Sequence, residues 1–298
     1  MRKLSLIITA IILLLGTNCT ETSKLDTLKN QIKVIIDNAD GTGGISIKNL
    51  ETNDTLSFNN NIHYPMQSVY KFPLAFAVLN RVDKGEFKLN QAIHISKNDL
   101  LPDTWSPLRE KYPDGNIELP LSEIINYTVS QSDNNGCDIL FRLIGGTKVV
   151  DEYIHGVGIN EISIQGTEEE IHKDWNVQFT NWCKPYAMIQ LLEILYQKKT
   201  LSDSCSNFLW KQMVETSTGP NRLKGLLPKE TIIAHKTGSS GKDENGITAA
   251  VNDIGIIKLP NGQHVAIVVF VSNSKVDDVV SERVIAEISK KVFDFYNK

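Results

Sequence analysis

Strand-forming segments lie near the two ends of this 298-residue chain, and a long helix-rich stretch separates them. Residues 43–48 and 55–58 have the composition of two hairpin strands. Residues 232–236, 247–258 and 264–271 are short β-rich runs in the last quarter of the chain. Because strands must pair to satisfy their backbone groups, this distribution predicts one antiparallel sheet assembled from both ends of the chain, with a helical segment inserted between them.

Apolar residues at helical spacing predict helices at both ends and through the middle. The terminal helices are expected over residues 22–38 and from about 280 to 292. In the middle, a stripe formed by Val69, Phe72, Phe76 and Leu79 predicts a helix that begins near residue 68. Further helices are expected over residues 121–129, 138–144 and 185–196. Pro73 is compatible with the helix that begins near residue 68 only if it falls in the first turn.

These elements predict an α/β (α+β) fold in which terminal helices flank an antiparallel sheet. Residues 19–65 and 213–298 are expected to form a discontinuous α/β domain. Residues 66–212 are expected to form a mainly helical domain, and an active site is expected in the groove between the two.

The first eighteen residues have the pattern of a cleavable signal peptide for export to the periplasm. Arg2 and Lys3 precede a twelve-residue apolar core from Leu4 to Leu15, which is too short to cross a bilayer. Cys19 offers an alternative, since a cysteine at this place can be lipidated and would tether the chain to a membrane. Asn18 is a poor residue before a lipidated cysteine, so cleavage without lipidation is the favoured interpretation.

Composition excludes several classes of function. The net charge is −4 and no basic block with interleaved aromatic residues occurs, so no nucleic-acid partner is expected. The six histidines show no metal-binding spacing, so neither a metal nor another cofactor is expected. Cys137, Cys183 and Cys205 outline no disulfide framework. Buried free thiols are the favoured interpretation, and one bridge among them is the alternative.

Ser68-Val69-Tyr70-Lys71 is the first motif with a chemical meaning. Residues three apart at the start of a helix share one face, so the Lys71 amine can reach the Ser68 hydroxyl. A serine becomes a useful nucleophile when a neighbouring base accepts its proton, and a desolvated lysine can be that base. Alone, this four-residue pattern occurs by chance in a chain of this length.

Two more motifs follow in the chain. In Ser132-Asp133-Asn134, the serine can carry a proton to a leaving nitrogen, the aspartate can hold the loop, and the asparagine amide can bind a substrate carbonyl. Lys236-Thr237-Gly238 ends a predicted strand, where the first two residues can bind a substrate carboxylate. The N–H of Ser239 can join that of Ser68 in stabilising an oxyanion. Each motif alone also fits an ordinary turn or strand end.

The three motifs in this order resemble class A β-lactamases and penicillin-binding proteins. The resemblance covers residues 22–298 and includes Tyr64-Pro65-Met66, Trp105-Ser106-Pro107 and Thr218-Gly219-Pro220. It implies a monomeric serine β-lactamase, a hydrolase that opens penicillins and cephalosporins through an acyl-enzyme on Ser68 and so confers antibiotic resistance. Lys71 and Ser132 would transfer protons, and Asn134 and Trp105 would contact the substrate.

The resemblance also implies a glutamate that activates water to release the acyl group. Counting back from His172 selects Glu168 among three adjacent acids. The chain departs from the common pattern here, because Glu169 replaces proline and Gly166 and Asn181 replace a closing ion pair. We therefore expect a trans bond after Glu168, a rearranged loop with fewer closing contacts, and His172 in part of the water-holding role.

Other departures concern the substrate. Gln67 before the nucleophile and His172 resemble a divergent branch that includes broad-spectrum cephalosporin hydrolysers. Thr248 stands where many relatives have a carboxylate-binding arginine, and Arg222 is the candidate to replace it, with a structural surface arginine as the alternative. A D,D-peptidase and a β-lactam sensor are the rival functions, and rapid release of the acyl group distinguishes a β-lactamase from both. The acylation base, Lys71 or Glu168, stays open.

Overall fold

The computed structural model describes residues 24–37 and 40–298. The predicted signal peptide and Cys19 lie outside these residues. Within the described part, no helix is long and apolar enough to cross a membrane.

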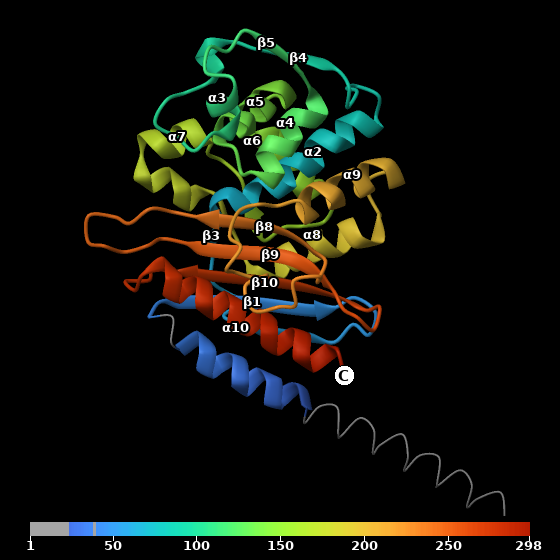
Figure 1. Ribbon diagram of the computed structural model, residues 1–298, viewed down its shortest axis with the longest axis vertical. Helices are drawn as coiled ribbons and strands as arrows, with labels where there is room; N and C mark the ends of the chain where they lie inside the picture. The colour runs from blue at the N-terminus through green and yellow to red at the C-terminus, as the bar shows by residue number, and fades with distance from the viewer. Residues whose placement is uncertain (1–23, 38–39) are drawn as a thin grey trace, which may run out of the picture.

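A five-stranded antiparallel sheet forms the lower half of the molecule in Figure 1, in the order β2-β1-β10-β9-β8. Its strands come from both ends of the chain, as the sequence predicts: β1 (Thr42–Asn49), β2 (Thr55–Phe58), β8 (Ile233–Ser239), β9 (Val251–Lys258) and β10 (His264–Ser272). The strand β1 pairs along its length with β10, so the two ends of the chain meet at the centre of the sheet. Strand β9 begins later than expected, and Thr248 lies in the loop before it.

Helices cover both faces of this sheet. The helix over residues 24–36 and α10 (Asp278–Tyr296) lie on one face, where Ile32, Ile47 and Ile288 belong to one continuous apolar core. On the other face, α8 (Pro185–Gln197) packs on β1 and β10, and α9 (Asp203–Val214) packs on β8. Both predicted terminal helices are confirmed.

The middle of the chain is mainly helical and contains a second, larger core. Its helices include α2 (Lys71–Asp83), α3 (Pro107–Lys111), α4 (Leu121–Ser130), α5 (Asn134–Ile144), α6 (Thr147–Gly156) and α7 (Glu168–Lys173). Two small sheets complete it, one of β4 (Ala92–Ile95) and β5 (Ile117–Pro120), the other of β3 (Tyr64–Pro65), β7 (Trp182–Cys183) and β6 (Ile162–Ser163). Short 3-10 helices include η2 (Gln67–Tyr70), η3 (Lys97–Asp99) and η4 (Trp175–Thr180).

Pro73 is accommodated because the α-helix begins late. Ser68 lies in η2, and α2 starts only at Lys71, so Pro73 is the third residue of the α-helix. Backbone N–H groups in a first turn have no partner within the helix, and a proline there removes no hydrogen bond. Pro73 therefore lies in the first turn of α2, the one place where the sequence analysis allowed it.

Cys137, Cys183 and Cys205 are buried free thiols, so no bridge forms among them. Burial raises the pKa of the Cys137 and Cys183 thiols well above the usual value, and it raises that of Cys205 to about 11. The favoured interpretation of these three cysteines is confirmed.

Candidate active site

Three elements bring the motif residues together at one place. The turn η2 carries Ser68, the connection between α4 and α5 carries Ser132, and β8 carries Lys236 and Thr237. A cavity of about 330 Å³ opens between them, and its lining includes Ser68, Ser132, Asn134, Glu168 and Thr237. The sequence motifs therefore meet in a single groove.

Lys71 is the centre of the polar contacts below this groove. Its side chain is fully buried, and Nζ donates to Ser68 Oγ at 2.9 Å, to Ser132 O at 2.8 Å and to Asn134 Oδ1 at 2.5 Å. The same nitrogen lies 2.9 Å from Glu168 Oε1. Since this amine contacts both Ser68 Oγ and the Glu168 carboxylate, a proton that leaves the serine can be relayed through Lys71 to Glu168.

Lys236 lies on the other side of Ser132. Its Nζ donates to Ser132 Oγ at 2.8 Å and to Thr237 O at 2.9 Å, and its side chain has no exposed surface. Burial, followed by the positive charge of Lys71, lowers the pKa of Lys236 well below that of a free lysine. Thr237 lines the groove, and its Oγ1 lies 2.6 Å from Thr218 Oγ1. Direct contact of Lys236 with a substrate carboxylate stays a prediction.

Two residues beside the reacting groups have left-handed backbone conformations. Gln67 has φ = 49° and Ser132 has φ = 59°, in a region that residues with a side chain seldom adopt. Backbone strain of this kind costs about 1–3 kcal/mol and persists only where neighbouring contacts hold it. At Ser132 the contacts include Asp133 N to Tyr127 O and Asn134 N to Trp105 O, each 3.0 Å.

Asp133 supports the second motif in the way that the sequence predicts. Its buried carboxylate accepts hydrogen bonds from Gly136 N, Leu108 N and Ser106 Oγ, so it joins α5 to the loop that carries Trp105. Burial raises the pKa of Asp133 in spite of these bonds. Trp105 itself is 57% exposed and lines the groove, while its Nε1 donates to Gln131 O.

Gly238 lets β8 approach the nucleophile turn. A Cβ atom at this position would lie 2.5 Å from Met66 O, which real side chains do not tolerate. The absence of a side chain therefore brings the N–H groups of this strand end close to Ser68, as the third motif predicts.

The three adjacent glutamates at the start of α7 have different surroundings. Glu168 points to Lys71, whereas Glu169 pairs with Lys173 at 2.7 Å and Glu170 closes a capping box with Thr167. Only Glu168 lines the groove. The choice of Glu168 from the sequence agrees with this placement.

The loop around Glu168 is closed by an amide instead of an ion pair. Asn181 Oδ1 accepts from Gln165 N at 2.7 Å and Gly166 N at 2.8 Å, and its Nδ2 donates to Gly166 O at 2.8 Å. The expectation of fewer closing contacts is therefore wrong. A side chain at position 166 would collide with Val177, which explains why an arginine has no room there. The bond between Glu168 and Glu169 is trans, as expected, and the described residues contain no cis bond.

Sequence reasoning missed Asp138 and Gln178. Asp138 accepts hydrogen bonds from Glu168 N and Glu169 N, both 2.9 Å, and so holds the start of α7. Gln178 of η4 accepts a hydrogen bond from Gln67 Nε2, which links the loop to the nucleophile turn. No local signal identifies either residue, because each acts across more than 25 positions of sequence.

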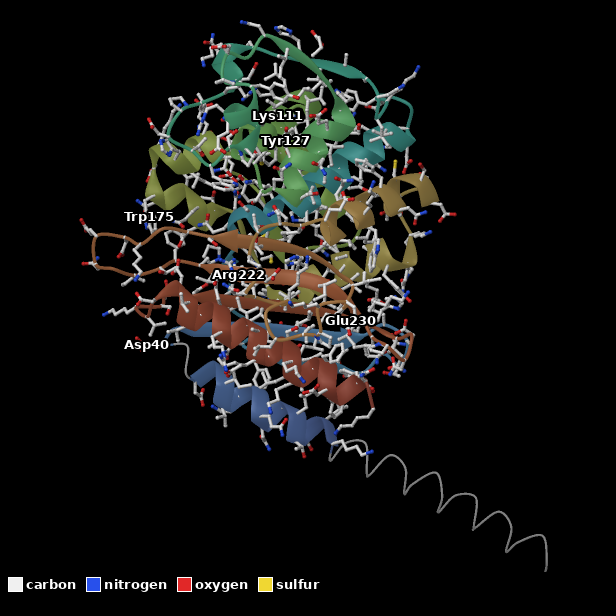
Figure 2. All side chains as sticks on the ribbon, in the orientation of Figure 1. Asp40, Lys111, Tyr127, Trp175, Arg222 and Glu230 are labelled. Atoms are coloured by element: carbon white, nitrogen blue, oxygen red, sulfur yellow. The ribbon has the colours of Figure 1, made fainter. Side chains whose placement is uncertain are left out.

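His172 and Trp175 line the outer groove beyond Glu168, together with Ser239, Ser240 and Gly241. His172 is exposed, and Figure 2 labels Trp175 on η4, beside α7. The small side chains at the end of β8 face this part of the groove and leave it open.

Arg222 is neither a surface residue nor part of the groove lining. It is 6% exposed, and its guanidinium donates to Gly238 O, Asn252 O and Ser239 Oγ, while Nε pairs with Glu282 at 3.1 Å. Figure 2 labels it in the sheet half of the molecule. Arg222 is buried behind Ser239, so it is not the surface arginine that the sequence offered as an alternative. It also does not line the groove, where direct contact with substrate was expected.

Among the described residues, no group of histidine, cysteine, aspartate and glutamate side chains has the arrangement of a metal site.

Comparisons with known proteins agree with this geometry. The profile of the β-lactamase enzyme family matches residues 27–296. Beta-lactamase VEB-1 of Pseudomonas aeruginosa is 49% identical over 276 residues, which cover 92% of each chain. Extended-spectrum beta-lactamase PER-1 of the same organism is 40% identical, covering 90% of this chain and 87% of its own. The crystal structure of TLA-3 extended-spectrum beta-lactamase superposes with a TM-score of 0.90 at 53% identity, covering 92% of this chain and 99% of its own.

Proposed function

Because the chain belongs to the class A branch of the β-lactamase enzyme family, we propose that it hydrolyses β-lactam antibiotics through an acyl-enzyme on Ser68. The observation that carries this proposal is the contact of one buried amine, Lys71 Nζ, with both Ser68 Oγ and Glu168 Oε1. A nucleophile and a base for water are thereby joined in one site.

In the first half of the reaction, Ser68 Oγ attacks the β-lactam carbonyl carbon. The serine proton passes to the neutral amine of Lys71, or through Lys71 to Glu168. As the C–N bond breaks, Ser132 gives its hydroxyl proton to the ring nitrogen and is reprotonated from Lys71. Ser132 is suited to this step because Lys71 contacts its carbonyl and Lys236 its hydroxyl. The backbone N–H groups of Ser68 and Ser239 would stabilise the oxyanion.

In the second half, Glu168 removes a proton from water, which attacks the ester carbonyl and releases Ser68. This step separates a β-lactamase from a D,D-peptidase or a β-lactam sensor, which keep their acyl group. The position of Glu168 at the groove favours the hydrolase.

Substrate contacts come from the groove walls. Asn134 Nδ2, which donates to Thr104 Oγ1 at 2.7 Å, faces the place of an acylamide side chain. Thr237 and Ser239 would bind the carboxylate, and Arg222 would act on it through Ser239 Oγ, 2.6 Å away. Trp105 and His172 would border the substrate side chain. Because PER-1 and TLA-3 are described as extended-spectrum enzymes, we infer that cephalosporins, including bulky oxyimino compounds, are substrates favoured over penicillins.

We also infer that residues 1–18 direct export to the periplasm and that the mature chain acts as a monomer. Residues 19–65 with 213–298 would form the α/β domain, and residues 66–212 the helical one. Lipidation of Cys19 is the outcome that would instead place the enzyme at a membrane.

Steady-state turnover of nitrocefin, a chromogenic cephalosporin, tests the proposed function. A β-lactamase releases many product molecules per enzyme molecule. A single burst of one product per enzyme molecule, without further turnover, would identify a peptidase or sensor and contradict the proposal. Comparing cefotaxime with benzylpenicillin then tests the substrate range separately, and a far lower kcat/KM for cefotaxime would contradict it.

A further inference from the structure

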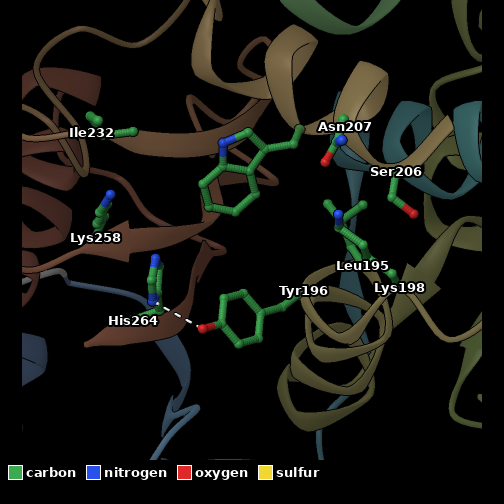
Figure 3. Close-up of a pocket in the computed structure, with 9 residues that line it drawn as sticks. Leu195, Tyr196, Lys198, Ser206, Asn207, Ile232, Lys258 and His264 are labelled. Atoms are coloured by element: carbon green, nitrogen blue, oxygen red, sulfur yellow. Dashed lines mark hydrogen bonds between the residues drawn. The ribbon is translucent and has the colours of Figure 1, made fainter. Parts of the chain in front are cut away.

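A second cavity, of about 290 Å³, shares no lining residue with the active-site groove. It lies between α8, α9 and the ends of three sheet strands. Figure 3 shows Ile232, Lys258 and His264 on the sheet side, facing Tyr196 and Leu195 of α8. Ile232 precedes β8, Lys258 ends β9, and His264 begins β10 directly opposite Lys258. The reaction proposed above uses none of these residues.

The aromatic wall of this cavity is held in place. Tyr196 Oη donates to Glu51 Oε1 at 2.7 Å, and the backbone N–H of His264 donates to Glu51 Oε2 at the same distance. The His264 ring centroid lies 4.9 Å from that of Tyr196 and 6.4 Å from that of Trp210. Since the rings are fixed before any ligand arrives, a flat molecule would bind with little loss of side-chain freedom.

The charge at the rim is positive. Lys198 is already paired with Asp203 at 2.9 Å, whereas Lys258 is exposed and forms no ion pair within the described part of the chain. The Glu51 carboxylate does not line the cavity, and hydrogen bonds from Tyr196 and His264 occupy it. A ligand with one negative charge therefore finds an unpaired partner in Lys258.

We propose that this cavity binds a small planar aromatic carboxylate. Its ring lies against Trp210, Tyr196 and Ile232, and its carboxylate lies at Lys258. Ile232 is 44% exposed although it is apolar, so a bound ring would remove its surface from water. The volume of about 290 Å³ accommodates a two-ring acid.

The chain's four tryptophans allow the two cavities to be observed together. Trp210 lines the proposed site, and Trp105 and Trp175 line the active-site groove. In a two-dimensional NMR titration with 2-naphthoate, the Trp210 indole N–H signal should shift and saturate while those of Trp105 and Trp175 stay in place. Trp210→Phe assigns the signal. Shifts confined to the groove tryptophans would overturn the proposal.

Two variants test the ring and the charge separately. Ile232→Glu puts a negative charge at the apolar wall and should weaken 2-naphthoate binding more than tenfold. Lys258→Gln should weaken it about three- to five-fold, the usual effect of an exposed ion pair, and should leave binding of neutral 2-naphthamide unchanged. Lys88→Gln, at an exposed lysine elsewhere, is the matched control.

A far-UV circular dichroism spectrum and a thermal midpoint close to those of wild type show that each variant is folded. Equal affinity of Ile232→Glu and wild type for 2-naphthoate would overturn the site. Equal affinity for the acid and the amide, or no effect of Lys258→Gln, would overturn its preference for an anion. These results are independent of the function proposed for Ser68.

Discussion

Glu168 and its two neighbours have the same side chain and differ only in what surrounds them. Glu168 contacts Lys71, Glu169 pairs with Lys173, and Glu170 caps α7. Glu168→Ala should therefore become acylated by a cephalosporin but release the product about 10²–10⁴-fold more slowly, the usual effect of losing a general base. Stopped-flow measurement of the deacylation rate checks this expectation.

Glu169→Ala and Glu170→Ala are matched controls, because each removes the same carboxylate from a position outside the groove. Both should deacylate at rates close to wild type. If either control accumulated the acyl-enzyme while Glu168→Ala turned over normally, the assignment of the base would be wrong.

Contacts between residues close in sequence were predictable, whereas the burial of single side chains was not. The spacing of Ser68 and Lys71 predicts their contact, because three positions at a helix start fix it locally. The burial of Lys236 and Arg222 could not be predicted, since it depends on how β8 packs on Ser132 and on α10. Long-range packing decides whether a lysine or arginine faces substrate or lies behind the residue that does.

The short helix α7 depends on Asp138 of α5, whose carboxylate accepts two of its N-terminal N–H groups. Burial, followed by the negative charge of Glu168, raises the pKa of Asp138 to about 7. The unfolded chain has a value of about 3.9. Because the folded protein then binds the proton more tightly, its stability should decrease as pH rises from about 4 to about 7.

Asp138→Asn removes this titration, so its thermal midpoint should fall less between pH 5 and pH 8 than that of wild type. Calorimetry or circular dichroism across this range measures the difference. Parallel curves for the two proteins would show that Asp138 does not titrate in this window.

The loop that precedes and follows α7 is closed by Asn181. Asn181→Ala would leave the buried N–H and C=O of Gly166 and the partly buried N–H of Gln165 without partners, at a cost of about 2 kcal/mol in the free energy of unfolding. Asn181→Asp keeps both acceptor bonds but buries a carboxylate oxygen against Gly166 O, so it should also lower the stability. Urea unfolding ranks the three proteins, and equal stability of Asn181→Ala and wild type would contradict this account of the loop.

The loop also explains why a pattern inferred from relatives can fail at the level of an element. The missing ion pair indicated a loosely held segment, yet Asn181 supplies three hydrogen bonds in its place. A side chain at position 166 would displace Val177, whose Cγ1 lies 2.5 Å from the place of a Cβ atom. An amide that bonds backbone groups leaves no charge pattern in the sequence.

Across the whole molecule, the absence of a bridge among Cys137, Cys183 and Cys205 has a measurable consequence. These thiols are buried and their pKa values are raised, so little reactive thiolate forms at neutral pH. Peptide mapping after treatment with iodoacetamide should find all three unlabelled in the native protein and labelled in urea. Labelling of Cys137 or Cys183 at the rate of a free thiol would contradict the packing.

The architecture of the molecule was the most predictable part. Strand patterns at both ends predicted one sheet built from both, and apolar periodicity located the terminal helices. The pairing of β1 with β10 became visible only in the structure. The start of β9 at Val251 instead of residue 247 was not predictable, because residues 247–250 continue the apolar pattern while the loop pairs Thr248 with Ser274. The sequence pattern shows which residues are apolar, but tertiary contacts decide at which residue a strand begins to pair with its neighbour.

The central claim, that Ser68 carries the acyl group, is tested most directly by intact mass spectrometry after mixing with cefotaxime. In the Glu168→Ala background, where release is slow, the protein should gain the mass of one opened antibiotic. The double variant Ser68→Ala/Glu168→Ala should gain none. Of the groups to which Lys71 Nζ donates, Ser68 Oγ is the hydroxyl, whereas the other two are the Ser132 carbonyl and the Asn134 amide oxygen. An adduct of the same mass on the double variant would contradict the account.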